Sequence, residues 1–566
     1  MKQFLSHSLT CLLGFSVFLL GCVKKEVDLN NIQGNWNPTV AASLVNSTMT
    51  AGDIITNTSA KGTFQINSDN SCSILYSGHL YSVMAKDLIV LPIQNIAQTI
   101  TLTQPEIQLL NSPLATVGVP ITLPVQTQTF TFNPGVNGPQ IDSVIFKSGL
   151  LTDSFASALP LDISCLITIP AAKDASGKSF SKTISNKYSG SGNQIVVSQV
   201  PLGGYHFDMS EGGTTNNQFV INYTLTITPL GKTVNAGNST ITVSQSFKNM
   251  LFDKFYGYVG QQSLSTMAQN ADTVSLAIFK NSYLIKSINL TNPSVKFYIS
   301  NSFGVPVQGS FPTLAGYTPP ANKIIVTGSG VPSNINVDYP TLAQIGKIRI
   351  DSFSLDNTNS NILNVISAQP QYFLYQFTTL SNPAGVTHNN FVIDTSRINL
   401  DMTIKIPLVG SATGLKLVDT INGFSANINQ SANGTQITSV DLRTTISNGF
   451  PMDMKVQVYF TDSVFHVIDS LFTTQYAIPA ATIVPNTFAG SYPNSYAAVT
   501  PNTATTDVFF NNQRVTNLNK ARKVLVVGNL NTAKYQNAMQ PVQIYANNKV
   551  SVNIGVKAVA TVPLHQ

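Results

Sequence analysis

The chain has 566 residues, of which 10% are charged, and its formal net charge at pH 7 is +6. This length is too great for one hydrophobic core, so we expect three or four domains. The small net charge and the scattered arginines leave no basic stripe and exclude a nucleic-acid-binding surface of the usual kind. With so few charges, solubility depends on Asn, Ser, Thr and Gln, which is common in secreted β-proteins.

The first residues predict export and a lipid anchor. Lys2 supplies the positively charged n-region of a signal peptide, and Leu12–Leu20 is an apolar stretch too short to span a bilayer as a mature helix. The stretch ends in Leu19-Leu20-Gly21-Cys22, which resembles the lipobox of bacterial lipoproteins; the resemblance implies that residues 1–21 are removed and that Cys22 carries the lipid. The residue after Cys22 is Val23, whereas lipoproteins retained in the inner membrane have an Asp at this position. The resemblance therefore implies the outer membrane. An ordinary signal peptide cut elsewhere is the alternative.

Two further cysteines remain in the mature chain. Removal of the leader discards Cys11, and the lipid takes Cys22, which leaves Cys72 and Cys165. A Cys72–Cys165 disulfide is one prediction for an envelope protein. The other is that Cys165, at an inward-facing position of an alternating segment, is a small buried hydrophobe.

Apolar and polar residues alternate with a period of two along most of the chain. This pattern is typical of strands with one face on a core and one in water. Gly and Pro interrupt it about every ten residues, as in sandwiches and barrels. The sequence therefore predicts an all-β protein with very little helix. The clearest strands are Phe219–Ile227, Met402–Leu408, Met452–Phe460 and Val550–Lys557, and the best helix candidates are Gln262–Asp272 and Asn517–Lys523.

One phrase recurs along the chain. "YISNSFGVPVQ" occupies 298–308 and "TISNGFPMDMKVQVYF" occupies 445–460. A longer segment at 140–170 has the same pattern of strand, short turn near a proline and second strand, and a fainter version lies at 105–125. We interpret each copy as a β-hairpin, with a bend that needs φ > 0 at Gly449 in the copy at 445–460. Spacings of about 150 residues indicate duplicated β-domains rather than a solenoid, whose repeats are shorter.

These copies divide the chain into domains in sequence order. We expect three to four tandem antiparallel β-sandwich domains, immunoglobulin-like or of a related type. The predicted segments are a leader at 1–21, an N-terminal β-domain at 22–129, β-sandwiches at 130–254 and 255–368, and one or more C-terminal β-domains at 369–566.

The repeated phrase also carries a resemblance. Together with segments such as Met402–Leu415, it resembles the β-sandwich of late-embryogenesis-abundant-type domains and of lipid-handling envelope proteins. The whole mature chain is similar to large, repeat-built lipoproteins of Gram-negative outer membranes, of which Asn35–Ile55 and Val542–Ala558 are typical. The resemblance implies a fold and a location, and it carries over no catalytic residue.

The sequence contains no motif of a common catalytic class. H-E-x-x-H, the P-loop, the Gly-rich nucleotide-binding pattern and G-x-S-x-G are all absent. His466 is predicted at an outward strand position rather than as a metal ligand. "NSDNS" at 67–71 is predicted to be a turn, because a calcium loop needs further ligands and a terminal Glu. We therefore expect no catalytic residue, no metal and no cofactor, although no pattern excludes the two acids of a glycosidase.

These observations predict a non-enzymatic, lipid-anchored outer-membrane lipoprotein that acts as a scaffold or binding surface on either side of that membrane. Its expected partners are the membrane, through Cys22, and an envelope protein, lipid or glycan. One alternative is a lipid carrier with an apolar groove, which stretches such as "LIVLPI" at 88–93 permit. Another is a glycan-binding surface, for which "YPNSYAAV" at 492–499 is the nearest aromatic cluster. A hydrolase is the last.

Overall fold

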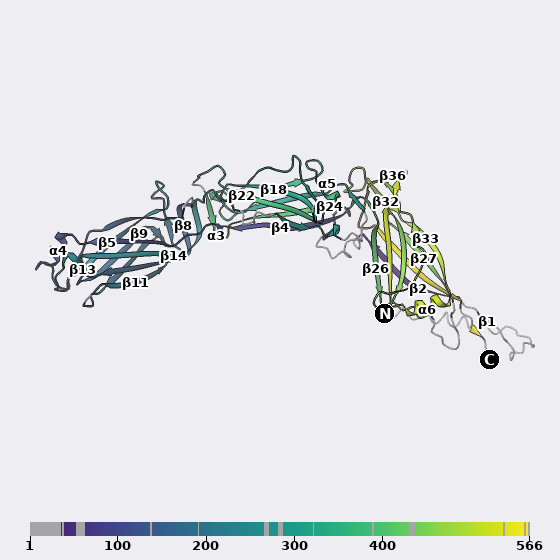
Figure 1. Ribbon diagram of the computed structural model, residues 1–566, viewed down its shortest axis with the longest axis horizontal. Helices are drawn as coiled ribbons and strands as arrows, with labels where there is room; N and C mark the ends of the chain where they lie inside the picture. Colours follow the sequence, from purple (N-terminus) through teal and green to yellow (C-terminus); the bar gives the residue numbers. More distant parts are fainter. Residues whose placement is uncertain are drawn as a thin grey trace, which may run out of the picture.

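The protein is an elongated row of three β-sandwich domains in the computed structural model (Figure 1). Strands hold 57% of the residues and helices 7%, which confirms the predicted all-β, multi-domain class. We call the domains base, middle and distal, starting from the end where the first and last described strands lie. The structure describes residues 35–36, 39–51, 63–135, 138–190, 192–264, 271–280, 287–320, 322–387, 390–428, 437, 439–535, 538–559 and 562–563.

The base domain has two antiparallel sheets, ordered β2-β38-β27-β33 and β26-β34-β28-β29, and β30 also pairs with β28. The strands of the first sheet are β2 (Thr39–Thr50), β38 (Lys549–Val559), β27 (Val440–Asn448) and β33 (Asn502–Phe510). Those of the second are β26 (Leu415–Asn422), β34 (Lys523–Thr532), β28 (Met452–Thr461), β29 (Val467–Ser470) and β30 (Tyr476–Ile478).

The middle domain has the sheets β21-β17-β24-β4-β3 and β15-β22-β18-β19, with β20 also on β18. The first contains β21 (Arg349–Leu355), β17 (Ser294–Asn301), β24 (Arg397–Pro407), β4 (Cys72–Met84) and β3 (Thr63–Ile66). The second contains β15 (Asp272–Ser275), β22 (Tyr372–Ser381), β18 (Val307–Thr318), β19 (Asn322–Ile325) and β20 (Ile335–Val337).

The distal domain is built from two matching sets of strands, joined by β12 (His206–Asp208), which pairs with both β8 and β9. One set pairs in the order β5-β14-β8-β11 and the other in the order β7-β13-β9-β10. The strands are β5 (Gln94–Thr101), β14 (Thr240–Tyr258), β8 (Gln140–Ser157), β11 (Gln194–Pro201), β7 (Gln126–Thr131), β13 (Gln218–Thr228), β9 (Asp162–Lys173) and β10 (Ser179–Asn186).

Smaller elements connect and cover these domains. A sheet ordered β16-β25-β37-β32-β31 lies where base and middle domains meet, and β1 pairs with β39. The remaining strands are β6 (Ile121–Thr122), β16 (Ser287–Leu290), β23 (Phe391–Ile393), β25 (Val409–Thr413), β31 (Thr482–Pro485), β32 (Tyr496–Thr500), β35 (Lys534–Tyr535), β36 (Ala538–Met539), β37 (Val542–Gln543), β1 (Asn35–Trp36) and β39 (Val562–Pro563). The helices are α3 (Ala85–Leu88), α4 (Gln104–Leu110), α5 (Ile362–Ser367), α6 (Asn512–Lys520) and the short 3₁₀ turns η2 (Ala236–Asn238), η3 (Ala277–Phe279) and η4 (Leu342–Gln344).

All three domains use the same strand order. If the eight main strands of each domain are numbered along the chain, one sheet reads 1-8-3-6 and the other 2-7-4-5. This is the order of a jelly roll, the double-sheet sandwich of two Greek keys, and it differs from the immunoglobulin order. The structure thus specifies which sandwich the alternating sequence forms, and it explains why the phrase recurs once in each domain.

The domains are nested rather than placed one after another. In the base domain the first strand is β2 and the second is β26, and the whole middle domain lies between them. In the middle domain the first of the eight main strands is β4, which the short β3 precedes, and the second is β15; the whole distal domain lies between β4 and β15. The predicted boundaries at 129, 254 and 368 therefore do not coincide with the sheets, because each first strand pairs with a last strand far along the chain: β2 with β38 and β4 with β24.

The recurring phrase forms an arch and not a hairpin. In the base domain β27 belongs to one sheet and β28 to the other, so the turn carries the chain across the sandwich. β17 and β18 do the same in the middle domain, and in the distal domain β8 and β9 belong to the two different sets of strands. The fainter copy at 105–125 forms no arch, since it contains α4 and the loop that leads to β6.

A buried polar side chain closes each arch. The Asn448 Oδ1 accepts from the backbone N–H of Phe450 at 3.0 Å, and its Nδ2 donates to two carbonyls. In the middle domain the Asn301 Oδ1 accepts from the N–H of Phe303 at 2.9 Å. In the distal domain the hydroxyl of Ser157 accepts from a backbone N–H two residues later, at 3.1 Å. The Asn or Ser of the phrase is thus a turn-forming side chain that satisfies backbone groups inside the core.

Gly449 does not have the positive φ that the hairpin interpretation required. Its constraint is one of space, because a Cβ at this position would lie 2.9 Å from the carbonyl oxygen of Lys549. The first residue of β38 passes directly beside the arch, so glycine allows the close approach of two backbones. Of the two predicted helices, Asn517–Lys523 overlaps α6, and most of Gln262–Asp272 lies outside the described residues.

Backbone hydrogen bonds cross both domain junctions. Between the base and middle domains the N–H of Cys72 donates to Ile544 at 3.2 Å, and the N–H of Ile544 donates to Leu408 at 2.9 Å. Between the middle and distal domains β14 continues beyond its own sandwich to pair with β23. The row of domains is therefore connected by sheet pairing and not by flexible linkers.

Candidate functional site

The predicted lipidation residue, Cys22, and the leader at 1–21 lie outside the described residues. Cys72 and Cys165 are both described, and both are buried free thiols. They lie in different domains, Cys72 at the start of β4 and Cys165 in the distal core on β9, so the alternative of a disulfide between them does not apply. Burial raises the pKa of the Cys72 thiol to about 11 and that of Cys165 to about 12. Cys165 is thus the buried hydrophobe that its alternating position indicated.

The described residues contain no group of three or more His, Cys, Asp or Glu side chains that could hold a metal ion. His466 is exposed, but it lies in the turn between β28 and β29 and not at the predicted strand position, and its Nδ1 lies 3.1 Å from the Oδ2 of Asp462. His79 makes a similar exposed pair with Asp401, at 2.8 Å. Within the described ranges, no helix is long and apolar enough to cross a membrane.

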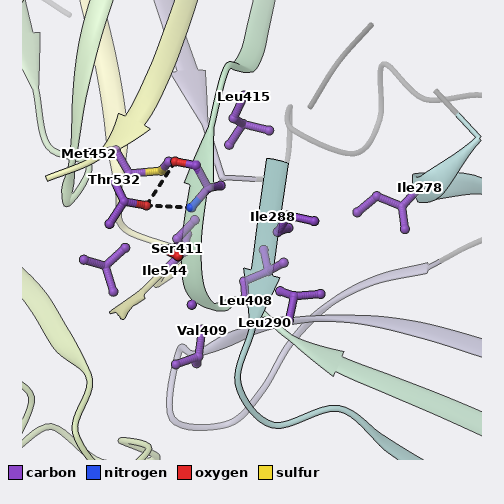
Figure 2. Close-up of a pocket in the computed structure, with 13 residues that line it drawn as sticks. Ile278, Ile288, Leu290, Leu408, Val409, Ser411, Leu415, Met452, Thr532 and Ile544 are labelled. Atoms are coloured by element: carbon purple, nitrogen blue, oxygen red, sulfur yellow. Dashed lines mark hydrogen bonds between the residues drawn. The ribbon is translucent and has the colours of Figure 1, made fainter. Parts of the chain in front are cut away.

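An apolar pocket lies at the junction of the base and middle domains (Figure 2). Its cavity volume is about 40 Å³. Pockets that hold small organic ligands usually measure about 300–1,000 Å³. Figure 2 shows that Thr532 closes one side, where its hydroxyl accepts from the N–H of Ala412 at 2.7 Å. The pocket is lined by Ile278, Ile288, Leu290, Leu408, Val409, Gly410, Ser411, Ala412, Leu415, Met452, Thr532, Val542 and Ile544. It is a packing gap between domains.

A polar groove of about 560 Å³ opens at the same junction. One wall is the turn at 67–71, which joins β3 to β4 and confirms the predicted turn. The other wall is the loop that contains Gly490, Ser491 and Tyr492, from the base domain. Lys405, near the end of β24, also lines the groove. Two segments far apart in the sequence thus form one site that offers carboxylate, ammonium, amide, hydroxyl and aromatic groups.

Gln543 holds the base-domain wall of this groove in place. Its side chain is fully buried, and its Nε2 donates to the carbonyl of Gly490 at 2.9 Å. Its Oε1 accepts from the N–H of Tyr492 at 3.1 Å and from the Nδ2 of Asn486 at 2.8 Å. One buried amide therefore ties both ends of the loop, which makes the wall a preformed surface.

Asp69 forms the contact between the two walls. Its Oδ1 accepts from the hydroxyl of Ser71 at 2.6 Å and from the N–H of Ser71 at 2.8 Å, and these bonds lower the pKa of the Asp69 carboxyl. Gly490 has φ = +69°, and a Cβ there would lie 1.7 Å from the Asp69 Oδ2. The groove consequently carries an ionised carboxylate at neutral pH, and glycine at 490 is required by conformation and by space.

A second polar cluster lies in the core of the distal domain and opens to no groove. Asp153 and Gln245 face each other across β8 and β14, and the Gln245 Nε2 donates to the Asp153 Oδ1 at 2.8 Å. The hydroxyl of Tyr223, from the opposite sheet, donates to the Gln245 Oε1 at 2.7 Å. Within the described part of the chain the Asp153 Oδ2 has no hydrogen-bond partner. Burial raises the pKa of Asp153 to about 6, although the Gln245 bond opposes the shift.

The aromatic residues of the segment predicted at 492–499 lie in two different settings. Tyr492 lines the polar groove, whereas Tyr496 lies half-buried at the start of β32. The neighbouring Phe488 is exposed and meets the ring of Tyr545 edge-on, with 5.8 Å between ring centroids. Sequence reasoning identified the Tyr492 segment and the 67–71 turn separately. It gave no sign that they meet.

No family model matches the chain, and no curated protein is significantly similar to it. Several solved structures show limited likeness. A protein of Parabacteroides distasonis ATCC 8503, whose name describes it as secreted, has 9% identity and a TM-score of 0.26, with 92% of this chain and 99% of that chain covered. The tandem CBM22 domains of Paenibacillus barcinonensis Xyn10C have 10% identity and a TM-score of 0.12, with 51% and 94% covered. A chain in the structure of the infectious bursal disease virus Gx strain has 9% identity and a TM-score of 0.14, with 81% of this chain and 87% of that chain covered.

Proposed function

We propose that this chain is a non-enzymatic lipoprotein, anchored in the outer membrane through Cys22, that acts as a rigid scaffold and holds its distal domain away from the membrane. The observation that carries this proposal is the nesting. Because each domain is inserted between the first two strands of the previous one, both ends of the described chain lie in the base domain. The distal domain is then the part farthest from an N-terminal anchor (Figure 1).

The continuity of the sheets supports a spacer role. β14 has 19 residues and extends from the distal sandwich into pairing with the middle domain, and ladder bonds join the middle domain to the base domain. A chain built to bring an enzyme to the membrane needs no such stiffness. A chain that positions a surface at a fixed height does, since a flexible linker would let that surface collapse toward the anchor.

Replacement of Cys22 tests the anchor. In cells that express Cys22→Ala, we expect no incorporation of a labelled fatty acid and loss of the protein from the membrane fraction, because thioether formation requires that sulfur. Ser463→Ala, an exposed substitution that leaves Cys22 in place, is the control and should be labelled like the unmodified chain. Fatty-acid label on the alanine variant would contradict the proposal.

The polar groove favours glycan binding as a second candidate function. It combines Tyr492, whose ring is a stacking surface, with the Asp69 carboxylate and the Lys405 ammonium, which suit a ligand rich in hydroxyl groups. Calorimetric titration with envelope oligosaccharides should show binding that Tyr492→Ala removes, with Phe488→Ala as the neighbouring control. Equal binding by both variants would contradict this assignment.

The lipid-carrier alternative receives no support from the junction pocket. A cavity of about 40 Å³ has space for little more than one or two water molecules, far less than an acyl chain fills. The segment at 88–93, which permitted a groove on sequence grounds, contains the end of α3 and the connection to β5, at the middle–distal junction.

A further inference from the structure

A hairpin tip at the lower end of the base domain exposes apolar side chains. β28 ends at Thr461 and β29 begins at Val467, and the tip between them contains Val464 and Phe465. The exposed fractions of these residues are 63% for Val464, 47% for Phe465 and 57% for Val467. Three large apolar side chains within four residues are thus offered to the surroundings at one point.

The backbone holds Phe465 in a costly conformation. Its φ is +71°, in the left-handed region that favours glycine or asparagine and that a bulky residue rarely adopts. Asp462 maintains the turn, because its Oδ1 accepts from the N–H of Val464 and from the N–H of His466, both at 2.9 Å. Strain of this kind usually persists where it has a use, and its visible result here is an aromatic ring that stands outside the fold.

Basic side chains surround this tip. The Lys523 Nζ lies 3.7 Å from the centroid of the Phe465 ring. Lys520, the last residue of α6, and Arg522, in the connection from α6 to β34, are both exposed. The nearby Asp462 carboxylate is occupied by backbone N–H groups and by His466. The tip therefore combines apolar and aromatic groups with an excess of positive charge.

The tip lies at the end where the described chain begins and ends. Thr461 pairs with Lys523 at the same level of the sandwich at which β34 begins and β26 ends. β2 starts at this same level with Thr39, and β38 ends at it with Val559. The two residues are direct partners in the sheet. Figure 1 shows α6 at this lower end, close to β1. An anchor on Cys22 would therefore bring this end of the base domain toward the membrane.

We propose that this end of the base domain binds the surface of an anionic phospholipid bilayer, with Phe465 and Val464 in the headgroup region and Lys520, Arg522 and Lys523 on the phosphates. Phe and other apolar side chains beside basic residues bind at a bilayer surface by entering the boundary between headgroups and acyl chains, and each basic residue near an anionic surface adds to the attraction. A surface for a protein partner would not require the apolar tip, the basic residues and the chain ends to lie at the same end of the molecule. The orientation rests on the proposed anchor, but the contact itself does not, so the two can fail separately.

The test uses unlipidated protein, so that binding reports the tip alone. The chain from residue 22 with Cys22→Ala keeps every described element, and it is sedimented with vesicles of phosphatidylethanolamine and phosphatidylglycerol at 3:1. We expect binding that weakens as salt is raised from 0.1 to 1 M and that is absent with phosphatidylcholine vesicles. Val464→Ser with Phe465→Gly should weaken binding at least about tenfold, and Lys520→Glu with Arg522→Glu by a similar factor.

Two comparisons keep the result interpretable. Phe465→Gly alone relieves the left-handed strain, so its melting temperature should not fall while its vesicle binding does, a combination that a structural role would not give. Leu114→Ser with Val117→Ser, at the far end of the molecule, is the control and should bind like the parent chain. The proposal is overturned if the tip variants bind as well as the parent, if the Leu114 and Val117 variant loses binding, or if the parent binds no vesicle. Vesicle binding together with a failed fatty-acid label would reject the anchor and keep the contact.

Discussion

The two ends of the molecule both expose apolar side chains, but the loops that carry them differ in charge. At the distal end, the loop after α4 exposes Leu114, Val117 and Val119, and Glu106 is the only charged residue between positions 88 and 141. At the base end, Val464 and Phe465 stand among basic residues. The domains share one strand order, so the difference arises in the loops. One architecture thus presents an apolar loop without charged residues of its own far from the chain ends, and a basic, aromatic tip beside them.

The largest expected effect comes from disrupting the core of the base domain and comparing the stability of the two end domains. Val456 is fully buried in the base domain, and Val456→Asp places an unpaired charge in its core. We expect a loss of about 4 kcal/mol or more of base-domain stability. The distal domain is continuous from β5 to β14, so it should stay folded. Limited proteolysis with mass spectrometry should release an intact fragment around 89–258, whereas the control Val117→Asp, at an exposed site, should leave the proteolysis pattern of the parent chain unchanged.

If the same treatment degraded the distal domain together with the base domain, the nested arrangement would not consist of separately stable units. The row of domains would then unfold as one cooperative body, in spite of the continuity of the distal chain.

The next largest effect concerns the buried carboxyl of Asp153 in the distal domain. The pKa of Asp153 is raised from 3.8 to about 6 in the folded state, so the folded protein holds this proton more tightly than the unfolded chain does. Its contribution to stability is therefore present below about pH 4 and is lost as pH rises to about 6, up to about 3 kcal/mol. Asp153→Asn should remove this dependence. Calorimetry of the distal transition at pH 4 and pH 8 should show a smaller pH effect in the variant.

The base domain has no matching buried acid among its described core residues, so its transition should not shift in parallel. An unchanged pH dependence of the distal transition in Asp153→Asn would mean that this carboxyl is not the group that titrates.

A smaller effect concerns the junction between the base and middle domains. Gly490→Ala introduces a Cβ against the Asp69 carboxylate at a position with φ = +69°, so we expect a cost above the roughly 1–2 kcal/mol of left-handed strain alone. Gly346→Ala is the matched control, because Gly346 has φ = +81° and no atom within 4 Å of the added Cβ. The difference between the two melting temperatures isolates the contact across the groove. Equal values would mean that Asp69 moves aside freely.

The smallest effect is expected at the distal loop. Leu114 is 82% exposed, so Leu114→Ser should change the free energy of unfolding by less than about 0.5 kcal/mol. Denaturant unfolding of the distal domain measures this directly. A larger loss would show that the loop is packed in solution and is not a free surface.

The local pattern of the sequence was sufficient for the strands. Alternation placed Met454, Val456 and Val458 on one inward face of β28, and all three are buried. The same alternation puts Gln457 on the outer face, yet Gln457 is buried because the chain at Phe472 folds over it, and its Nε2 donates to the Phe472 carbonyl. Local periodicity reports one face of a strand, but it does not report what later covers the other face.

The nesting could not be predicted in the same way. The pairing of β2 with β38 joins Thr39 to Val559, and no local signal in either strand identifies the other. The arch was misread because a strand–turn–strand phrase fits a hairpin equally well, and only the partners of the strands decide between them. The groove was missed for the same reason, since Asp69 and Tyr492 come from distant segments.

Two of the sites, the buried Asp153 and the tip at Val464 and Phe465, do leave a local signal in the sequence. Asp153 stands at an inward position between Leu151 and Phe155, where an acid in a period-two strand indicates a buried carboxyl. Val464 and Phe465 are consecutive apolar residues between polar ones, which breaks the alternation and is typical of an exposed tip. Both signals are local departures from the pattern that otherwise predicted the fold correctly.

The most direct test of the account measures the height of each end above the membrane. The protein is lipidated at Cys22 and reconstituted in a bilayer with an acceptor dye in the headgroups, and a donor is attached at Asn512→Cys in α6 or at Leu114→Cys in the distal loop. We predict strong energy transfer from the donor at residue 512 and almost none from the donor at residue 114. Equal transfer from both positions would mean that the molecule lies flat on the bilayer, which would contradict the scaffold that holds its distal domain away from the membrane.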